Sequence, residues 1–312
     1  MTLTMSKLAK PLSQLFLLAM VSYVSPRALS QMGQIIPTQV YSEFQPPIAI
    51  SALPSGLLPI LESRGGLLIL NPTAGSVTRI KETLGNVRPL DLVASVVDGQ
   101  EYIFVTMYWA ISTQSSGSNQ ALVVQYSLQG EEVHRWAAWG QIYGGVSLDQ
   151  ANRTFYIADA GNANVLTLAM EKGATPSVLA HVNGASRLGA LVLDTTGHRL
   201  FVSDPDLGNV YALDLVSRRS KTIASGLGDP AALTYGPTEH KLYVADAAKH
   251  TIWQIPVDAP VPKLSAFSTA HELREPRGVA MGSGNNLWVA DYGARAIFQL
   301  SPGGQVVRSF RR

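Results

Sequence analysis

The sequence of 312 residues contains no cysteine, and this absence removes several kinds of chemistry at once. Disulfide bonds, thiolate ligands for a metal and cysteine nucleophiles are all excluded. Charged residues are scarce as well, at 15% of the chain, and the formal net charge is only +2. Because no long run of lysine or arginine is present to neutralise a row of phosphates, the sequence argues against a nucleic-acid partner.

Long hydrophobic runs are also lacking, apart from one short run near the start. Lys7 and Lys10 precede an apolar stretch at residues 15–24, and a small-x-small sequence follows at residues 28–30. A membrane-spanning helix needs about 20 apolar residues, whereas a signal peptide has this shorter pattern. We therefore expect residues 1–30 to be a cleaved signal peptide and the protein to be secreted or periplasmic (extracytoplasmic). An uncleaved anchor and an organellar transit sequence are the alternatives.

Established catalytic motifs are missing too. The chain has no G-x-S-x-G sequence and no P-loop. Its histidines show neither His-x-His nor His-x₃-His spacing: they are His134, His181, His198, His240, His250 and His271. A zinc site would need three of them to converge from distant parts of the chain. We predict no metal site and no cofactor, with Ca²⁺ or another divalent ion as the alternative.

What the sequence does contain is a repeat. Short apolar strands that end in Ala-Asp or Ser-Asp recur with their aspartates at Asp159, Asp204, Asp246 and Asp291, at spacings of 45, 42 and 45 residues. Weaker copies align Glu62 and Thr106 with these aspartates. Six units of about four strands each are typical of the blades of a β-propeller.

The repeat predicts an all-β chain: a six-bladed β-propeller with four antiparallel strands per blade over residues 48–312. Residues 31–47 precede the first blade, and within this segment residues 34–41 are a candidate for an additional edge strand that closes the ring. Closure of the ring protects strand edges from other chains. We expect the propeller to be a monomer.

The sixth unit carries a family resemblance. Residues 276–300, PRGVAMGSGNNLWVADYGARAIFQL, resemble an NHL repeat, and the third and fifth units also match well. The resemblance implies a six-bladed propeller. It does not choose a function, because the family includes interaction modules and enzymes, and a fold alone does not specify an activity.

Loops that join one blade to the next (d–a loops) and the b–c loops gather on one face of a propeller, where ligands bind over the channel. Arg88, Arg187 and Arg277 come from the d–a loops of blades 2, 4 and 6. We predict that they bind an anionic ligand through bidentate contacts. The alternative is that they form salt bridges with carboxylates of neighbouring blades.

An insertion in the second blade suggests a second part of the same surface. Its polar loop follows Trp109, and Trp139 and Tyr143 lie where the blade's last strand ends. Exposed aromatic side chains beside a polar loop are suited to stacking on sugars or holding a peptide. We predict a recognition patch of Trp109, Trp139 and Tyr143, and assign Trp136 to the core.

The repeated carboxylates have two interpretations. A ring of them could bind Ca²⁺, but a residue repeated in every unit is better explained by hydrogen bonds from its own turn. Asn152 begins the sequence Asn-Arg-Thr, an N-glycosylation sequon placed in an a–b turn on the opposite face.

The function predicted from these features is a ligand- or protein-binding module whose partner is a protein, peptide or glycan. The alternative is a propeller enzyme with its site in the channel. A metal-dependent lactonase would require an early Glu-Gly-Pro strand and inner-strand asparagines, and an amidating lyase would require channel histidines and disulfides. A strictosidine-synthase-like enzyme would require a channel-facing glutamate. None of these patterns is found in the sequence.

Overall fold

The computed structural model describes residues 38–40, 45–109, 120–139 and 143–311. The predicted signal peptide and the polar loop after Trp109 lie outside these residues. For Trp109, Trp139 and Tyr143 only the backbone is described. One compact unit, Thr38–Arg312, contains every described strand.

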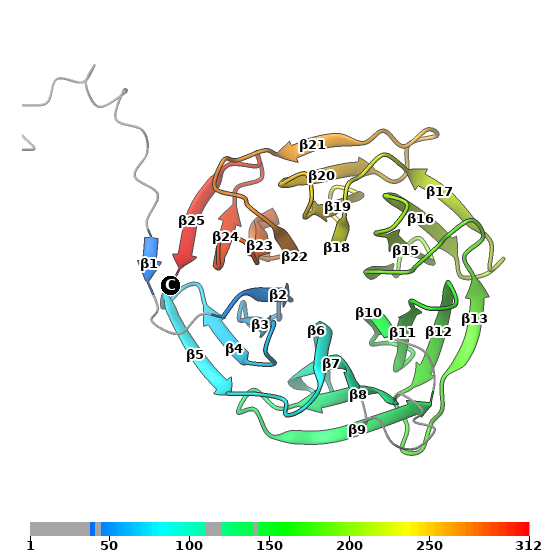
Figure 1. Cartoon of the computed structure of the whole chain (residues 1–312), viewed down its shortest axis with the longest axis horizontal. Helices are drawn as coiled ribbons and strands as arrows, with labels where there is room; N and C mark the ends of the chain where they lie inside the picture. Colours follow the sequence, from blue (N-terminus) through cyan, green and yellow to red (C-terminus); the bar gives the residue numbers. More distant parts are fainter. Residues whose placement is uncertain (1–37, 41–44, 110–119, 140–142, 312) are drawn as a thin grey trace, which may run out of the picture. The chain divides into compact units, whose positions relative to one another are not determined.

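Six antiparallel sheets surround a common axis, and each is formed by consecutive strands a to d of the chain (Figure 1). Blade 1 contains β2 (Pro47–Ile50), β3 (Leu58–Glu62), β4 (Leu67–Asn71) and β5 (Ser76–Lys81). Blade 2 contains β6 (Arg88–Val97), β7 (Gln100–Trp109), β8 (Gln120–Tyr126) and β9 (Glu132–Trp139). Blade 3 contains β10 (Tyr143–Asp149), β11 (Thr154–Asp159), β12 (Asn164–Ala169) and β13 (Ser177–His181).

The other three blades repeat this arrangement. Blade 4 contains β14 (Leu191–Asp194), β15 (Arg199–Asp204), β16 (Asn209–Asp214) and β17 (Ser220–Ala224). Blade 5 contains β18 (Pro230–Gly236), β19 (Lys241–Asp246), β20 (Thr251–Pro256) and β21 (Ser265–Ser268). Blade 6 contains β22 (Pro276–Met281), β23 (Leu287–Asp291), β24 (Ala296–Leu300) and β25 (Val306–Arg311). The predicted six-bladed, four-stranded architecture is confirmed.

A further strand, β1 (Thr38–Val40), lies along the outer edge of blade 6. It pairs with β25 in parallel, with Thr38 opposite Ser309 and Val40 opposite Arg311. The predicted edge strand at residues 34–41 therefore has a described counterpart of three residues. All other strand pairs in the described part of the chain are antiparallel.

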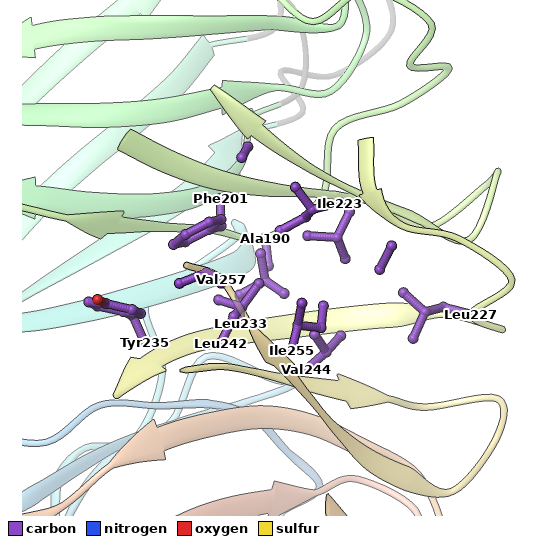
Figure 2. Close-up of a cluster of buried hydrophobic side chains, with 13 residues drawn as sticks. Ala190, Phe201, Ile223, Leu227, Leu233, Tyr235, Leu242, Val244, Ile255 and Val257 are labelled. Carbon is purple, nitrogen blue, oxygen red and sulfur yellow. The ribbon is translucent and has the colours of Figure 1, made fainter. Parts of the chain in front are cut away.

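Most hydrophobic clusters of this ring lie between neighbouring blades, because one blade cannot bury both faces of its sheet. Figure 2 shows the cluster between blades 4 and 5, where Phe201 and Ile223 face Leu233, Leu242 and residues around them. Burying an aliphatic or aromatic side chain of this size contributes about 1.5–3 kcal/mol. The inner strands are held in place by such contacts, which fixes the walls of the central channel.

The repeated aspartates hold the loops around the channel. The buried carboxylate of Asp246 accepts backbone N–H bonds from Gly228 and Asp229 at 2.9 Å each, and from Lys249 at 3.1 Å. Asp291 binds the equivalent N–H groups of its own blade. The structural interpretation is therefore correct for these two aspartates, and it extends beyond the b–c turn to the d–a loop that leads into the blade. It does not hold in full for every unit. Glu62 accepts hydrogen bonds from the side chain of Arg79. Asp159 accepts one from the side chain of Asn162.

Strand pairing corrects one detail of the repeat. Pro276 lies opposite Asp291, whereas in blade 2 the equivalent Pro89 lies opposite Met107. The alignment of Thr106 with the aspartates was thus wrong by one residue. The reason is that β7 has no acidic residue at this position, so nothing in its apolar sequence marks the register.

No described residue belongs to a helix that could cross a membrane. The only helical element in the described ranges is a single 3-10 turn, η1 (Ser283–Asn285).

Candidate binding site at the mouth of the channel

A cavity of about 570 Å³ opens at one end of the channel. Its walls include the starts of the inner strands and the d–a loops. The b–c turns contribute Ala160, Gly161 and Pro205. This is the face on which the sequence placed the candidate ligand site. Its volume lies in the usual range of small-molecule sites, roughly 300–1,000 Å³.

Arg88, Arg187 and Arg277 all line this cavity. Arg88 is the first residue of β6, Arg277 is the second residue of β22, and Arg187 precedes β14. They come from blades 2, 4 and 6, so every second blade of the ring contributes a positive charge to the cavity. The structure thus brings together the three arginines that the sequence predicted to meet.

Two of the three arginines have carboxylate partners. The Nη2 group of Arg187 lies 2.8 Å from Asp206 Oδ1, and Arg277 Nη2 lies 2.6 Å from Glu275 Oε1. Their Nε groups donate to the same two oxygens. Both arginines thus form salt bridges, as the alternative interpretation expected. Each of these partners, however, lies at the arginine's own blade and not at a neighbouring one. These bonds use the N–H groups on one edge of each guanidinium, so the N–H groups on the other edge do not take part in them.

Arg88 differs from the other two. Its backbone pairs with Tyr108 in the sheet, but among the described residues its guanidinium has neither an ion-pair partner nor a hydrogen-bond partner, and the residue is exposed. An arginine that is not neutralised within a concave site raises the local positive potential and attracts anions. Arg88 is consequently the strongest candidate for a direct contact with an acidic ligand.

Asp229 brings a negative group into the same cavity. Burial raises the pKa of its carboxyl, and the neighbouring Arg277 and then Arg187 oppose that rise. Arg277 Nη2 lies 3.8 Å from Asp229 Oδ2. Asp229 therefore belongs to the same charge network as the arginines.

Asp91 is a candidate that the sequence reasoning missed. It lies on β6 opposite Thr106, directly after a β-bulge. The equivalent residues of the other inner strands are all small: Ala49, Gly145, Ala190, Ala232 and Gly278. The signal was visible as Leu-Asp-Leu in blade 2, where the other copies have only alanine or glycine before the apolar residue.

The carboxylate of Asp91 joins two blades. Its Oδ1 accepts the N–H of Leu92 at 2.8 Å, and its Oδ2 accepts the N–H of Val146 on β10 at 3.1 Å. Burial raises the pKa of Asp91 to about 7, and these two hydrogen bonds offset only part of the rise. The side chain still lines the cavity, so it is partly accessible while protein atoms replace most of its hydration.

A second cavity of about 360 Å³ occupies the opposite part of the channel. It shares Asp91 and Ala190 with the first, so these two residues lie where the cavities meet. Its walls are mainly aliphatic side chains, among them Leu92, Val146 and Leu233. Asp91 is the only acidic residue among the lining residues of this second cavity.

The predicted aromatic patch stays a prediction, because only the backbone of its three residues is described. Gln120 pairs with Trp109 on one side and with Trp139 on the other, so the two tryptophans lie two strands apart in blade 2. Tyr143 starts β10 opposite Asp159. Trp136 is buried and its Nε1–H donates to the backbone carbonyl of Glu171, which confirms its assignment to the core.

Histidine and carboxylate groups do not form a metal centre within the described ranges. No cluster of three or more such side chains is present there. His198 and His240 occupy the same left-handed turn position, with φ of 48° and 51°. His240 Nδ1 lies 2.8 Å from Asp258 Oδ2 on the turn following β20, away from the arginine cavity.

Comparison with known proteins supports the fold and adds one family match. Residues 183–311 match the family model described as the SMP-30/Gluconolactonase/LRE-like region. No curated protein sequence matches the chain. The protein is a six-bladed β-propeller. The finer assignment to NHL repeats is not shown by these comparisons and stays a prediction.

Solved propellers of several kinds share this architecture. The structure is similar to one in a nidogen/laminin complex, with a TM-score of 0.64 at 17% identity, covering 80% of this chain and 91% of that chain. Streptogramin B lyase gives a TM-score of 0.60 at 12% identity, covering 87% and 85%. A putative oxidoreductase (glucose dehydrogenase) of Thermus thermophilus gives 0.59 at 16%, covering 84% and 95%. At such low identity these likenesses concern the fold alone.

Proposed function

We propose that this propeller is a binding module that holds a small acidic ligand, such as a carboxylate or a phosphate, in the cavity at the mouth of the channel. The observation that carries the proposal is the convergence of Arg88, Arg187 and Arg277 on one cavity of about 570 Å³. Guanidinium groups bind carboxylates and phosphates through charge-assisted hydrogen bonds, each stabilising by about 1.5–3 kcal/mol.

The three arginines have different roles in this proposal. Arg88 has no side-chain partner among the described residues, so it contributes a whole guanidinium to the ligand. Arg187 and Arg277 are oriented by Asp206 and Glu275, and they contribute the N–H groups that those carboxylates leave free. Arginines that are already fixed lose less side-chain entropy when a ligand binds.

Calorimetry with citrate and inorganic phosphate as probes tests the proposal. We expect Arg88→Gln to weaken binding of the better probe at least tenfold, with a smaller salt dependence, because a ligand-contacting charge is lost. The matched control is Arg218→Gln, which removes the same charge from an exposed turn outside the cavity. Equal affinities of the two variants and the wild type would reject the proposal.

Two further parts of the proposal rest on sequence patterns. The pattern in residues 1–30 supports export with cleavage after Ser30, so the N-terminal sequence of the exported protein should begin at Gln31. The aromatic residues Trp109, Trp139 and Tyr143 support a protein, peptide or glycan partner at the same face. Names of similar propellers include a lyase, a dehydrogenase and a laminin complex, so they favour neither binding nor catalysis.

A further inference from the structure

Asp91 is an unneutralised acid within a cavity that is otherwise defined by arginines. It lines the mouth cavity together with Arg88, yet no cationic side chain contributes to its ionisation equilibrium. Both hydrogen bonds to its carboxylate come from uncharged backbone N–H groups. A carboxylate that is shielded from water and has no positive partner is strongly stabilised when it binds a cation or a proton.

The elements packed around Asp91 offer it no compensating charge. On β7 its neighbour is Thr106, and on β10 it contacts Val146. The inner strand of blade 1, Pro47–Ile50, contains no titratable residue. The other charged residues that line the cavity are Arg88, on the same strand as Asp91, and Arg187, Asp229 and Arg277 from other blades. Two of those arginines are already paired with carboxylates.

From this arrangement we propose that Asp91 binds a protonated amine of the ligand, so that the cavity selects a small zwitterion whose acid group contacts Arg88. This inference rests on the proposed function and specifies its ligand class. Arg88 and Asp91 lie on one strand, three residues apart, which corresponds to about 10 Å between their Cα atoms. Both side chains line the same cavity, so we expect a spacer of a few methylene groups between the acid and the amine of the ligand.

The affinity of this site for an amine should depend on pH in the opposite direction to its affinity for a simple anion. Because the pKa of Asp91 lies at about 7, part of the population is protonated at neutral pH. An amine binds only the ionised carboxylate, so binding releases a proton and becomes tighter as pH rises through 7. A simple anion has the opposite effect, because its negative charge favours protonated Asp91.

The experiment compares ω-amino acids with their unaminated counterparts. Glycine, 4-aminobutanoate and 6-aminohexanoate are titrated by calorimetry beside acetate, butanoate and hexanoate, at pH 6 and pH 8, in two buffers of different ionisation enthalpy. We expect one amino acid to bind at least tenfold more tightly than its counterpart at pH 8. At pH 6, where Asp91 is mostly protonated, its binding should be weaker and should release close to one proton. The advantage at pH 8 should disappear in Asp91→Asn, while binding of the plain carboxylate is retained.

The two proposals fail in different ways. If amino acids and plain carboxylates bind alike, or if Asp91→Asn keeps the preference for the amine, the zwitterion inference is overturned while Arg88-dependent acid binding stands. If Arg88→Gln leaves acid binding unchanged, the proposed function is overturned instead.

A second measurement covers the case in which Asp91→Asn does not fold, since Asp91 also links two blades. The carboxyl resonance of Asp91 in the labelled wild type is titrated with and without the amino acid. A fall in its pKa on binding supports the inference, and an unchanged or raised value overturns it.

Discussion

The side-chain oxygen of Ser147 in blade 3 accepts a hydrogen bond of 3.2 Å from the backbone N–H of Leu193 in blade 4. The same bond recurs from blade 1 to blade 2 and from blade 5 to blade 6. The pairs are Ser51 with Ala94 and Thr234 with Met281. At the equivalent position the even-numbered blades have Val93, Val192 and Ala280, which have no hydroxyl. The hydroxyl bonds therefore join the blades two by two.

Removing one of these bonds should weaken the ring measurably. We expect Ser147→Ala and Thr234→Val each to lower the free energy of unfolding by about 1 kcal/mol, because a backbone N–H beside the channel loses its acceptor. Denaturant unfolding measures the difference. Thr78→Val, at an exposed position of β5, is the control and should change stability little. Equal stability of all three variants would show that water replaces the hydroxyl.

The turn between β24 and β25 contains a glycine that no other residue can replace easily. Gly304 has φ of +79°, and a Cβ at this position would collide with the carbonyl oxygen of Phe267 in blade 5. We expect Gly304→Ala to destabilise the protein by roughly 2 kcal/mol or more. Its neighbour provides the control, since a Cβ at Gly303 would meet nothing closer than 3.7 Å. A thermal melt in which both variants behave alike would contradict this explanation.

Asp91 should also make stability depend on pH. Its pKa is raised to about 7 in the folded protein, so the folded state binds an additional proton between about pH 4 and pH 7. Stability contributed by this group is therefore greatest below pH 4 and falls as pH rises towards 7, by up to about 4 kcal/mol. The stability difference between wild type and Asp91→Asn, measured at several pH values, isolates this contribution. A difference that is constant from pH 4 to pH 8 would contradict it.

The aromatic patch predicts a separation of binding from stability. Alanine at Trp109 and at Trp139 should abolish binding of a glycan or peptide partner found on arrays, without lowering the melting temperature. Trp136→Ala serves as the contrast, because its buried ring contacts Phe104 and Phe155 and its loss should cost about 3–5 kcal/mol. A large fall in melting temperature for Trp109→Ala would place that ring in the core.

The sequence repeat predicted the architecture because every blade has the same strands and packs on its neighbours in the same way. The aspartates at the ends of strands b bind the N–H groups of two loops, so they recur wherever those loops recur, as Asp246 and Asp291 show. The same reasoning placed Arg88, Arg187 and Arg277 on one face, since their loops occupy equivalent positions in the repeat.

Asp91 was beyond this reasoning because its importance lies in a departure from the repeat. A lone carboxylate in an apolar strand resembles an ordinary surface position until the β-bulge turns it towards Val146. The partners of Arg187 and Arg277 were likewise uncertain, because ion pairs depend on loop conformations that a repeat pattern does not specify.

The parallel pairing of β1 with β25 has a consequence for the time at which the protein is completed. Thr38 and Ser309 are neighbours in the sheet but are separated by about 270 positions in the chain. At roughly 5–20 residues per second, the ribosome makes β25 on the order of 15–50 s after β1. During that interval β1 has no strand to pair with, and its pairing must wait until blade 6 has been made.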